Sequence, residues 1–187
     1  MAERGWSSFV PAGGDLAVAT DLYQLTMAAA YAESERERRG TFELSVRSLP
    51  AHRNFLVFAG LEPALAALSE LRFSAAQLEY LRGLPAFAAV GDEFFDRLSE
   101  LRFRGDVWAM DEGSVFFPGE PVLAVSGDLL EAQIVETLLL SIINFQTTIA
   151  SKAARMRLVA GDGVQLAEFG TRRAPGPPPG LAARRPA

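Results

Sequence analysis

The sequence predicts a mixed α+β fold, in which strands lie among short helices and precede a long helical region. Residues 41–49 alternate between apolar and polar side chains, which is typical of a strand with one buried face. Several other segments repeat apolar residues at helical spacing. The chain has 187 residues, whereas a complete (β/α)8 barrel takes about 250, so a barrel of that size is excluded.

The first helix is predicted from Thr20 to Ala32, because Thr20 and Asp21 are helix-starting residues ahead of a run of packing side chains. The charged residues that follow are expected to continue this helix as a solvated turn. Gly40 is expected to stop it, since glycine commonly ends helices. The half-buried strand at 41–49 comes directly after.

Three short helices are predicted next. The first covers residues 62–71, and a capping box of Ser74 and Gln77 opens the second, which Gly83 ends. The third begins behind Asp92, an N-cap residue type. The apolar residues expected to face the core on these helices are Leu61, Leu65, Leu68, Leu71, Leu78, Leu81, Phe94, Phe95, Leu98 and Leu101.

A strand-rich stretch follows the short helices. Residues 102–107 alternate around Gly105, which is interpreted as a bulge. Asp111 and Glu112 are adjacent and resemble a carboxylate pair. Neighbouring strand residues point to opposite faces, however, so the two are interpreted as turn residues. Residues 122–125 form a further apolar strand.

The last third of the chain is predicted to be mostly helical. Asp128 opens a helical region that is expected to reach Ala160, with a break near residues 141–144. Residues 164–169 are predicted to form a fully buried strand of the parallel type.

Composition excludes several kinds of chemistry. The absence of cysteine removes disulfides and thiolate sites and fits a reducing compartment. His52 is the single histidine, so a multi-histidine metal site is excluded, and His52 is interpreted as a surface or packing residue. The net charge of −5 argues against binding to nucleic acid or to an anionic membrane. The apolar stretch 129–150 does not suit a membrane span, because it contains Glu131, Gln133, Glu136, Asn144 and Gln146.

Two segments carry side chains suited to ligand binding. Tyr23 and Gln24 place an aromatic ring and an amide at the start of the first helix, where they can stack on and orient a flat heterocycle. The alternative is an ordinary capped amphipathic helix. Arg172 and Arg173 follow the predicted strand 164–169. Ligands gather at the carboxyl ends of parallel strands, and guanidinium groups there suit phosphate or carboxylate. The alternative there is a basic exit of the strand into solvent.

Several motifs occur together in a fixed order along the chain. They are TDLYQLTMAAAY, RNFLVFAGLE, DEGSVFFPGEPVLAVSG, LLEAQIVETLLLSIINFQTTIASKAARM and LAEFGTRRA. Over residues 15–174 this set resembles the N-terminal part of nicotinate phosphoribosyltransferase. The resemblance implies an N-terminal domain with antiparallel strands at 15–127, after a flexible N-terminus at 1–14. It also implies that residues 128–170 begin an incomplete α/β barrel of the type II phosphoribosyltransferase kind.

The resemblance also implies an activity. The family joins nicotinate to phosphoribosyl pyrophosphate, with ATP and Mg²⁺, in the salvage of NAD, and its members are cytoplasmic homodimers. By position, Tyr23 is the tyrosine that stacks on nicotinate. Arg172 and Arg173 are the basic groups expected to meet the phosphates or the carboxylate of the substrates.

The sequence departs from the family pattern after GTRRA. Pro175–Gly180 follows, where the family continues a helix, and the family's phosphate-carrying histidine has no counterpart. We therefore expect no catalytic residue, no metal site and no complete ATP site. The chain is expected to be a truncated, inactive fragment whose Pro- and Arg-rich tail at 171–187 is disordered. The alternatives are a quinolinate phosphoribosyltransferase-like enzyme and a non-catalytic dimerisation module.

Overall fold

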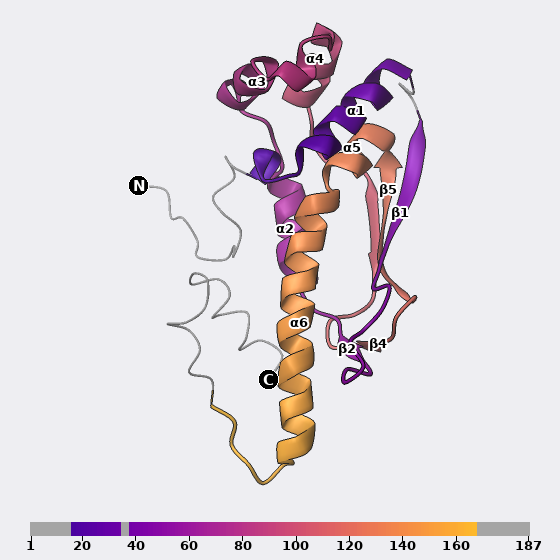
Figure 1. The fold of residues 1–187 in the computed structure, drawn as a ribbon, viewed down its shortest axis with the longest axis vertical. Helices are drawn as coiled ribbons and strands as arrows, with labels where there is room; N and C mark the ends of the chain where they lie inside the picture. Colours follow the sequence, from indigo (N-terminus) through magenta and orange to yellow (C-terminus); the bar gives the residue numbers. More distant parts are fainter. Residues whose placement is uncertain (1–15, 35–37, 168–187) are drawn as a thin grey trace. The chain divides into compact units, whose positions relative to one another are not determined.

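The computed structural model describes residues 16–34 and 38–167, and it confirms the mixed α+β class (Figure 1). The chain divides into two compact units. Unit 1 consists of Met1–Phe42, Glu62–Val107 and Ala124–Leu140, and unit 2 consists of Glu43–Leu61, Trp108–Leu123 and Ser141–Ala187.

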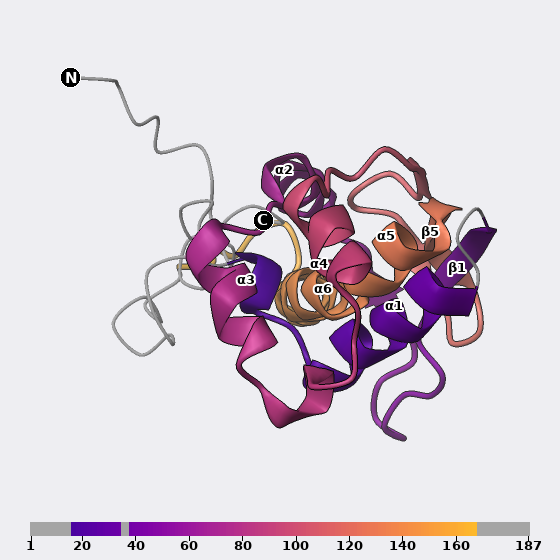
Figure 2. The same ribbon diagram turned by 90° about the horizontal axis from the view of Figure 1, so that it is seen from above.

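Helices make up most of the described structure. In chain order they are α1 (Leu22–Ser34), α2 (Leu61–Glu70), α3 (Ala75–Arg82), α4 (Asp92–Ser99), α5 (Leu129–Ile134) and α6 (Glu136–Ala160). Two 3-10 turns lie at Leu16–Val18 and Pro85–Phe87. Within unit 1, α1 packs beside α5, as both views show (Figure 2).

The strands form two small sheets. The first has three strands in the order β1-β5-β3, with bounds Arg39–Ser45, Pro121–Asp128 and Asp106–Ala109. The second pairs β2 (Leu56–Val57) with β4 (Val115–Phe116), antiparallel, so that Leu56 lies opposite Phe116. β1 starts two residues before the predicted strand 41–49, and Phe42 is exposed, whereas Leu44 and Val46 are half-buried as expected.

The predicted short helices are confirmed, because their start and stop signals are local. In α3 the Ser74 side chain accepts from the Gln77 backbone, the Gln77 side chain accepts from the Ser74 backbone, and Gly83 ends the helix. In α4 the N-cap is Gly91 rather than Asp92, which is the first helical residue.

The apolar face of α4 is buried in unit 1, as predicted. Phe94, Phe95 and Leu98 are all at most 3% exposed. Phe94 and Phe95 lie edge to face with ring centroids 5.3 Å apart, and Phe87 stacks on Phe94 at 6.0 Å. Such aromatic pairs add about 0.5–1.5 kcal/mol beyond the area they bury, so this cluster anchors the short helix.

The predicted apolar face of α2 is partly wrong. Leu68 is buried, but Leu65 is 44% exposed. The buried face instead includes Pro63, Ala64 and Ala67. Small side chains let a helix approach its neighbours closely, so packing selects this face over the larger leucine.

The expected role of Gly40 as a helix stop is wrong. α1 ends at Ser34, and Gly40 lies inside β1. A Cβ at this position would come 2.9 Å from Leu129 Cδ1. The glycine is therefore explained by a close approach of a neighbouring side chain to the strand, not by helix termination.

The break in the long helical region lies earlier than predicted. Asp128 does open α5, because its carboxylate accepts from the backbone N–H groups of Leu130 and Glu131. The helix then breaks at Val135, and residues 141–144 lie inside α6. A hydrogen-bond network described below accounts for the position of the break.

Two predicted strand segments are also corrected. Residues 102–105 precede β3 rather than belonging to it, and Gly105 is required because a Cβ there would lie 2.5 Å from the Ser126 carbonyl oxygen. Residues 164–167 form no strand, and Val164 is 49% exposed. A strand needs at least one neighbouring strand for its backbone hydrogen bonds, and residues 164–167 pair with no described strand. Residues 168–169 and the tail at 171–187 lie outside the described residues.

Candidate functional site

The start of α1 presents one exposed ring and one buried amide. Tyr23 is 51% exposed, whereas Gln24, the next residue, is fully buried. Consecutive helical residues point in directions about 100° apart, which explains how neighbours can differ so completely. Of the predicted pair, only the Tyr23 ring faces outward, whereas the Gln24 amide is buried, and binding of a flat ligand by the ring stays a prediction.

A hydrogen-bond network joins this helix start to α5 and α6. Gln24 Nε2 donates to Tyr23 Oη at 2.7 Å, and the Tyr23 hydroxyl is hydrogen-bonded to the Glu136 carboxylate. Gln133 Nε2 donates to Gln24 Oε1 and, at 3.3 Å, to Glu136 Oε2. Gln133 lies in the last turn of α5 and Glu136 is the first residue of α6, so the break at Val135 lies between them. The side chains of Tyr23, Gln24, Gln133 and Glu136 therefore form a closed cycle of hydrogen bonds.

The electrostatic surroundings keep Tyr23 protonated. Partial burial raises the pKa of Tyr23 above its ordinary value, and the carboxylates of Glu136 and Asp21 raise it further. The Gln24 amide opposes this, because its N–H stabilises the phenolate. Asp21 is itself held by the Thr137 hydroxyl, which donates to Asp21 Oδ2 at 3.3 Å. At neutral pH the site therefore offers a neutral phenol ring.

The other predicted binding residues are not placed. Arg172 and Arg173 lie outside the described residues, so their position relative to Tyr23 stays a prediction. His52 is exposed in the loop after β1.

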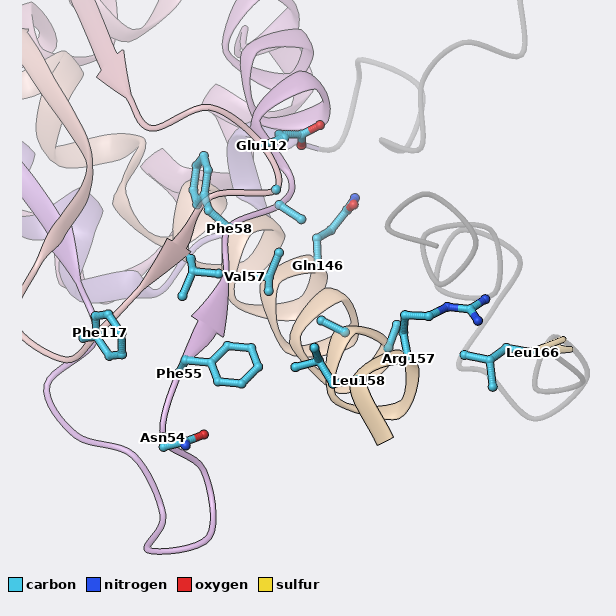
Figure 3. A pocket seen from close by; sticks show the side chains of 15 residues that line it. Asn54, Phe55, Val57, Phe58, Glu112, Phe117, Gln146, Arg157, Leu158 and Leu166 are labelled. Carbon is cyan, nitrogen blue, oxygen red and sulfur yellow. The ribbon is translucent and has the colours of Figure 1, made fainter. Parts of the chain in front are cut away.

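A separate cavity of about 910 Å³ lies within unit 2 (Figure 3). Phe55, Val57 and Phe58 line it on one side, and Arg157 and Leu158 of α6 line it on another. Its lining is mostly apolar, and the polar side chains among the described lining residues are those of Asn54, Glu112, Gln146 and Arg157.

Glu112, at the rim of this cavity, has a role that the turn interpretation missed. Its Oε1 accepts from the backbone N–H of Gly60 at 2.6 Å and of Leu61 at 2.8 Å. Leu61 is the first residue of α2, so the carboxylate caps a helix start some fifty residues earlier in the chain. Gly60 has φ of +104°, and a Cβ there would lie 3.1 Å from Gln146 Cβ. No local pattern in the sequence signals such a distant partner.

Within residues 16–34 and 38–167, no group of three or more histidine or acidic side chains could hold a metal ion. Over the same described residues, no helix is both long enough and apolar enough to cross a membrane.

The geometry defines a class first: an α+β domain in which hydrogen bonds hold an exposed aromatic ring at a helix start. The sequence matches, over residues 18–144, the family model described as the N-terminal domain of nicotinate phosphoribosyltransferase. The chain belongs to the nicotinate phosphoribosyltransferase family.

Individual relatives agree with this assignment. The chain is 44% identical to nicotinate phosphoribosyltransferase pncB2 of Mycobacterium tuberculosis over 160 residues, which is 86% of this chain and 34% of that protein. It is also 44% identical to the Bacillus subtilis nicotinate phosphoribosyltransferase, covering 85% of this chain and 32% of that protein. The chain thus spans about a third of the length of the curated relatives it matches.

Solved structures support the fold. The human nicotinic acid phosphoribosyltransferase structure matches with a TM-score of 0.80 and 40% identity, over 88% of this chain and 33% of that one. The nicotinate-nucleotide pyrophosphorylase of Pyrococcus furiosus matches with a TM-score of 0.56 at 24% identity, which shows a shared fold alone.

Proposed function

We propose that this chain supplies the nicotinate-contacting part of a nicotinate phosphoribosyltransferase. Such an enzyme forms nicotinate mononucleotide and pyrophosphate from nicotinate and phosphoribosyl pyrophosphate. The observation that carries the proposal is the half-exposed Tyr23 ring, held at a helix start by buried partners. A flat pyridine ring can stack on this face, since aromatic pairs favour offset stacking.

The charged part of the ligand needs cationic partners. Nicotinate carries a carboxylate, and its co-substrate carries phosphates. Arg172 and Arg173 would supply guanidinium forks to one or both. Use of ATP and Mg²⁺ belongs to the proposal through the family. The described residues do not fit an ion site, so no step is derived through the metal.

Assembly and location complete the proposal. A homodimer would let Tyr23 of one subunit face the reaction site of another, which suits a ring that is half-exposed in a single chain. A cytoplasmic location fits the absence of cysteine.

A domain exchange tests the proposal. The 160 matched residues of the Bacillus subtilis relative are replaced by those of this chain, and formation of nicotinate mononucleotide is measured. We expect the chimera to be active. Tyr23→Ala should raise KM for nicotinate about tenfold, because stacking on an aromatic side chain is worth about 1–3 kcal/mol.

Tyr80→Ala is the matched control, since Tyr80 is 63% exposed and lies outside the network. A folded chimera without product, or equal KM values for the two tyrosine variants, would contradict the proposal. Quinolinate in place of nicotinate tests the related enzyme class and should give no product.

A second candidate function is a non-catalytic dimerisation module. The observation in its favour is the exposed apolar end of α6, where Leu158 is 70% and Val159 is 89% exposed. Analytical ultracentrifugation of the chain and of Leu158→Glu tests whether this end of α6 forms a dimer. Because the proposed enzyme is a homodimer too, the module is supported only if the charge dissociates a dimer and the folded chimera forms no product.

A further inference from the structure

The network around Tyr23 consists of side chains that are far more buried than the ring they contact. Gln24 is fully buried and Gln133 is 3% exposed. A buried amide without partners costs about 1–3 kcal/mol, so such groups persist only when they are hydrogen-bonded. Here Gln24 uses its N–H on Tyr23 and its carbonyl oxygen on Gln133, and Gln133 uses its N–H groups on Gln24 and Glu136.

The direction of each hydrogen bond in the network follows from its one carboxylate. Glu136 ends it as a carboxylate, which only accepts, so Gln133 must donate to it. The Gln133 amide also donates to Gln24 Oε1, which turns the Gln24 N–H₂ toward the phenol. The orientation of Gln24 is therefore set by Gln133, more than one hundred residues further along the chain.

The phenol of Tyr23 is occupied on both sides. Its oxygen accepts from Gln24, and its proton is held by the Glu136 carboxylate. The hydroxyl therefore has no proton to give to a ligand. What remains available is the ring face, with its position fixed at the oxygen end by two partners.

We propose that Gln24 and Gln133 are positioning residues for nicotinate binding, which hold the Tyr23 ring so that it selects a flat ring by stacking and not by a hydrogen bond from its hydroxyl. This inference rests on the proposed contact between Tyr23 and nicotinate. Neither glutamine touches the ligand in this scheme, and both act through the orientation of one phenol.

A titration of the full chain tests the network without any ligand. Tyr31→Phe and Tyr80→Phe leave Tyr23 as the single tyrosine, whose ionisation is followed by phenolate absorbance. In this background Gln24→Met should move the Tyr23 titration to higher pH, because the phenolate loses a donor. Glu136→Gln should move it to lower pH, because a carboxylate near the phenolate is removed.

The opposite signs distinguish positioning from loosening of the structure. A change that merely freed the ring would move both variants toward the ordinary value of about 10. Gln146→Met is the matched control, since it removes a buried amide in unit 2, and it should leave the titration unchanged. Circular dichroism confirms folding of each variant. Movement of the Gln24→Met titration to lower pH, or no movement, would overturn the proposed network.

Kinetics of the chimera test whether the network serves binding. Gln24→Met and Gln133→Met should each raise KM for nicotinate about three- to tenfold, with kcat changed less than about twofold, as loss of one hydrogen bond predicts. Unchanged KM values in both variants would sink the inference while leaving the proposed function intact. If Tyr23→Ala also left KM unchanged, the proposed contact itself would fail, whatever the titration showed.

Discussion

The serine and threonine contacts of α6 in unit 2 and the network around Tyr23 in unit 1 serve different purposes. In unit 2 they satisfy backbone groups: Ser151 Oγ accepts from the Val57 N–H at 2.8 Å, and Thr147 Oγ1 accepts from the Ala59 N–H at 3.3 Å. In unit 1 the Gln24 and Gln133 side chains satisfy one another and end at a ring. The difference shows how polar contacts that stabilise the fold can be distinguished from polar contacts that hold a proposed ligand-binding side chain.

The contacts of unit 2 follow from the shape of its sheet. β2 is only two residues long and pairs with β4 alone, so its free edge would leave backbone N–H groups without partners. Serine and threonine of α6, with Glu112, take the place of a third strand. The network of unit 1 joins side chains to one another and not to a strand edge, so we assign it the role of holding the Tyr23 ring.

The largest expected effect is on unit 2. Ser151→Ala should lower the free energy of unfolding by about 2 kcal/mol, because it leaves the buried Val57 N–H without an acceptor. Ser69→Ala, the same change at an exposed helix position, should stay within about 0.5 kcal/mol. Urea denaturation followed by circular dichroism measures both. Equal effects would remove the distinction between buried support and surface.

A smaller loss of stability is expected from Gln133→Met. The apolar side chain of similar length fills the space, but Gln24 Oε1 loses its donor, so we expect a loss of about 1–2 kcal/mol. The comparison becomes sharper when the Tyr23 titration is measured as well. Ser151→Ala should leave that titration in place, whereas the variants of unit 1 move it. Movement in both units would refute the division of roles.

Glu131 supplies a test with a pH sign. Burial raises the pKa of Glu131, although the Arg104 backbone N–H, which donates to Oε2 at 2.9 Å, acts against this. A raised pKa favours folding below the unfolded value and loses that contribution as pH rises through the folded value. Glu131→Gln should therefore raise Tm at neutral pH, with a gain that shrinks toward acid pH. A gain that grew at acid pH would contradict the assignment.

The smallest expected effect is that of Asp106→Asn. Asp106 and Arg39 are 3.7 Å apart, and both side chains are about two-thirds exposed. Exposed ion pairs contribute about 0–1 kcal/mol, so the free energy of unfolding should change by less than about 0.5 kcal/mol. High salt should abolish even this difference. A larger change would mean that surface charge, and not only buried pairing, stabilises unit 1.

The features that were predictable are local ones. Ser74 and Gln77 lie three residues apart, and this spacing in the sequence predicts their capping box. Asp128 is also adjacent to the helix that it caps. In both cases the partner groups lie within one helical turn, so propensity and spacing suffice.

The features that escaped prediction depend on distant partners. Gln133 and Glu136 appeared in the sequence only as polar interruptions of an apolar stretch, because their partner on α1 lies far away along the chain. For the same reason the sequence did not reveal the helix break at Val135 or the position of Gly40 inside a strand. Polar residues recurring in an otherwise apolar helical run were the available signal for a buried network.

Gly60 restricts how this protein can vary. Its φ of +104° is a conformation that side chains rarely adopt, and a Cβ would also meet Gln146 Cβ at 3.1 Å and the Ile142 carbonyl oxygen at 3.3 Å. Every missense change of a glycine codon adds at least a Cβ. Because the positive φ and the backbone oxygen of Ile142 remain whatever residue stands at 146, we expect every substitution at position 60 to destabilise the protein.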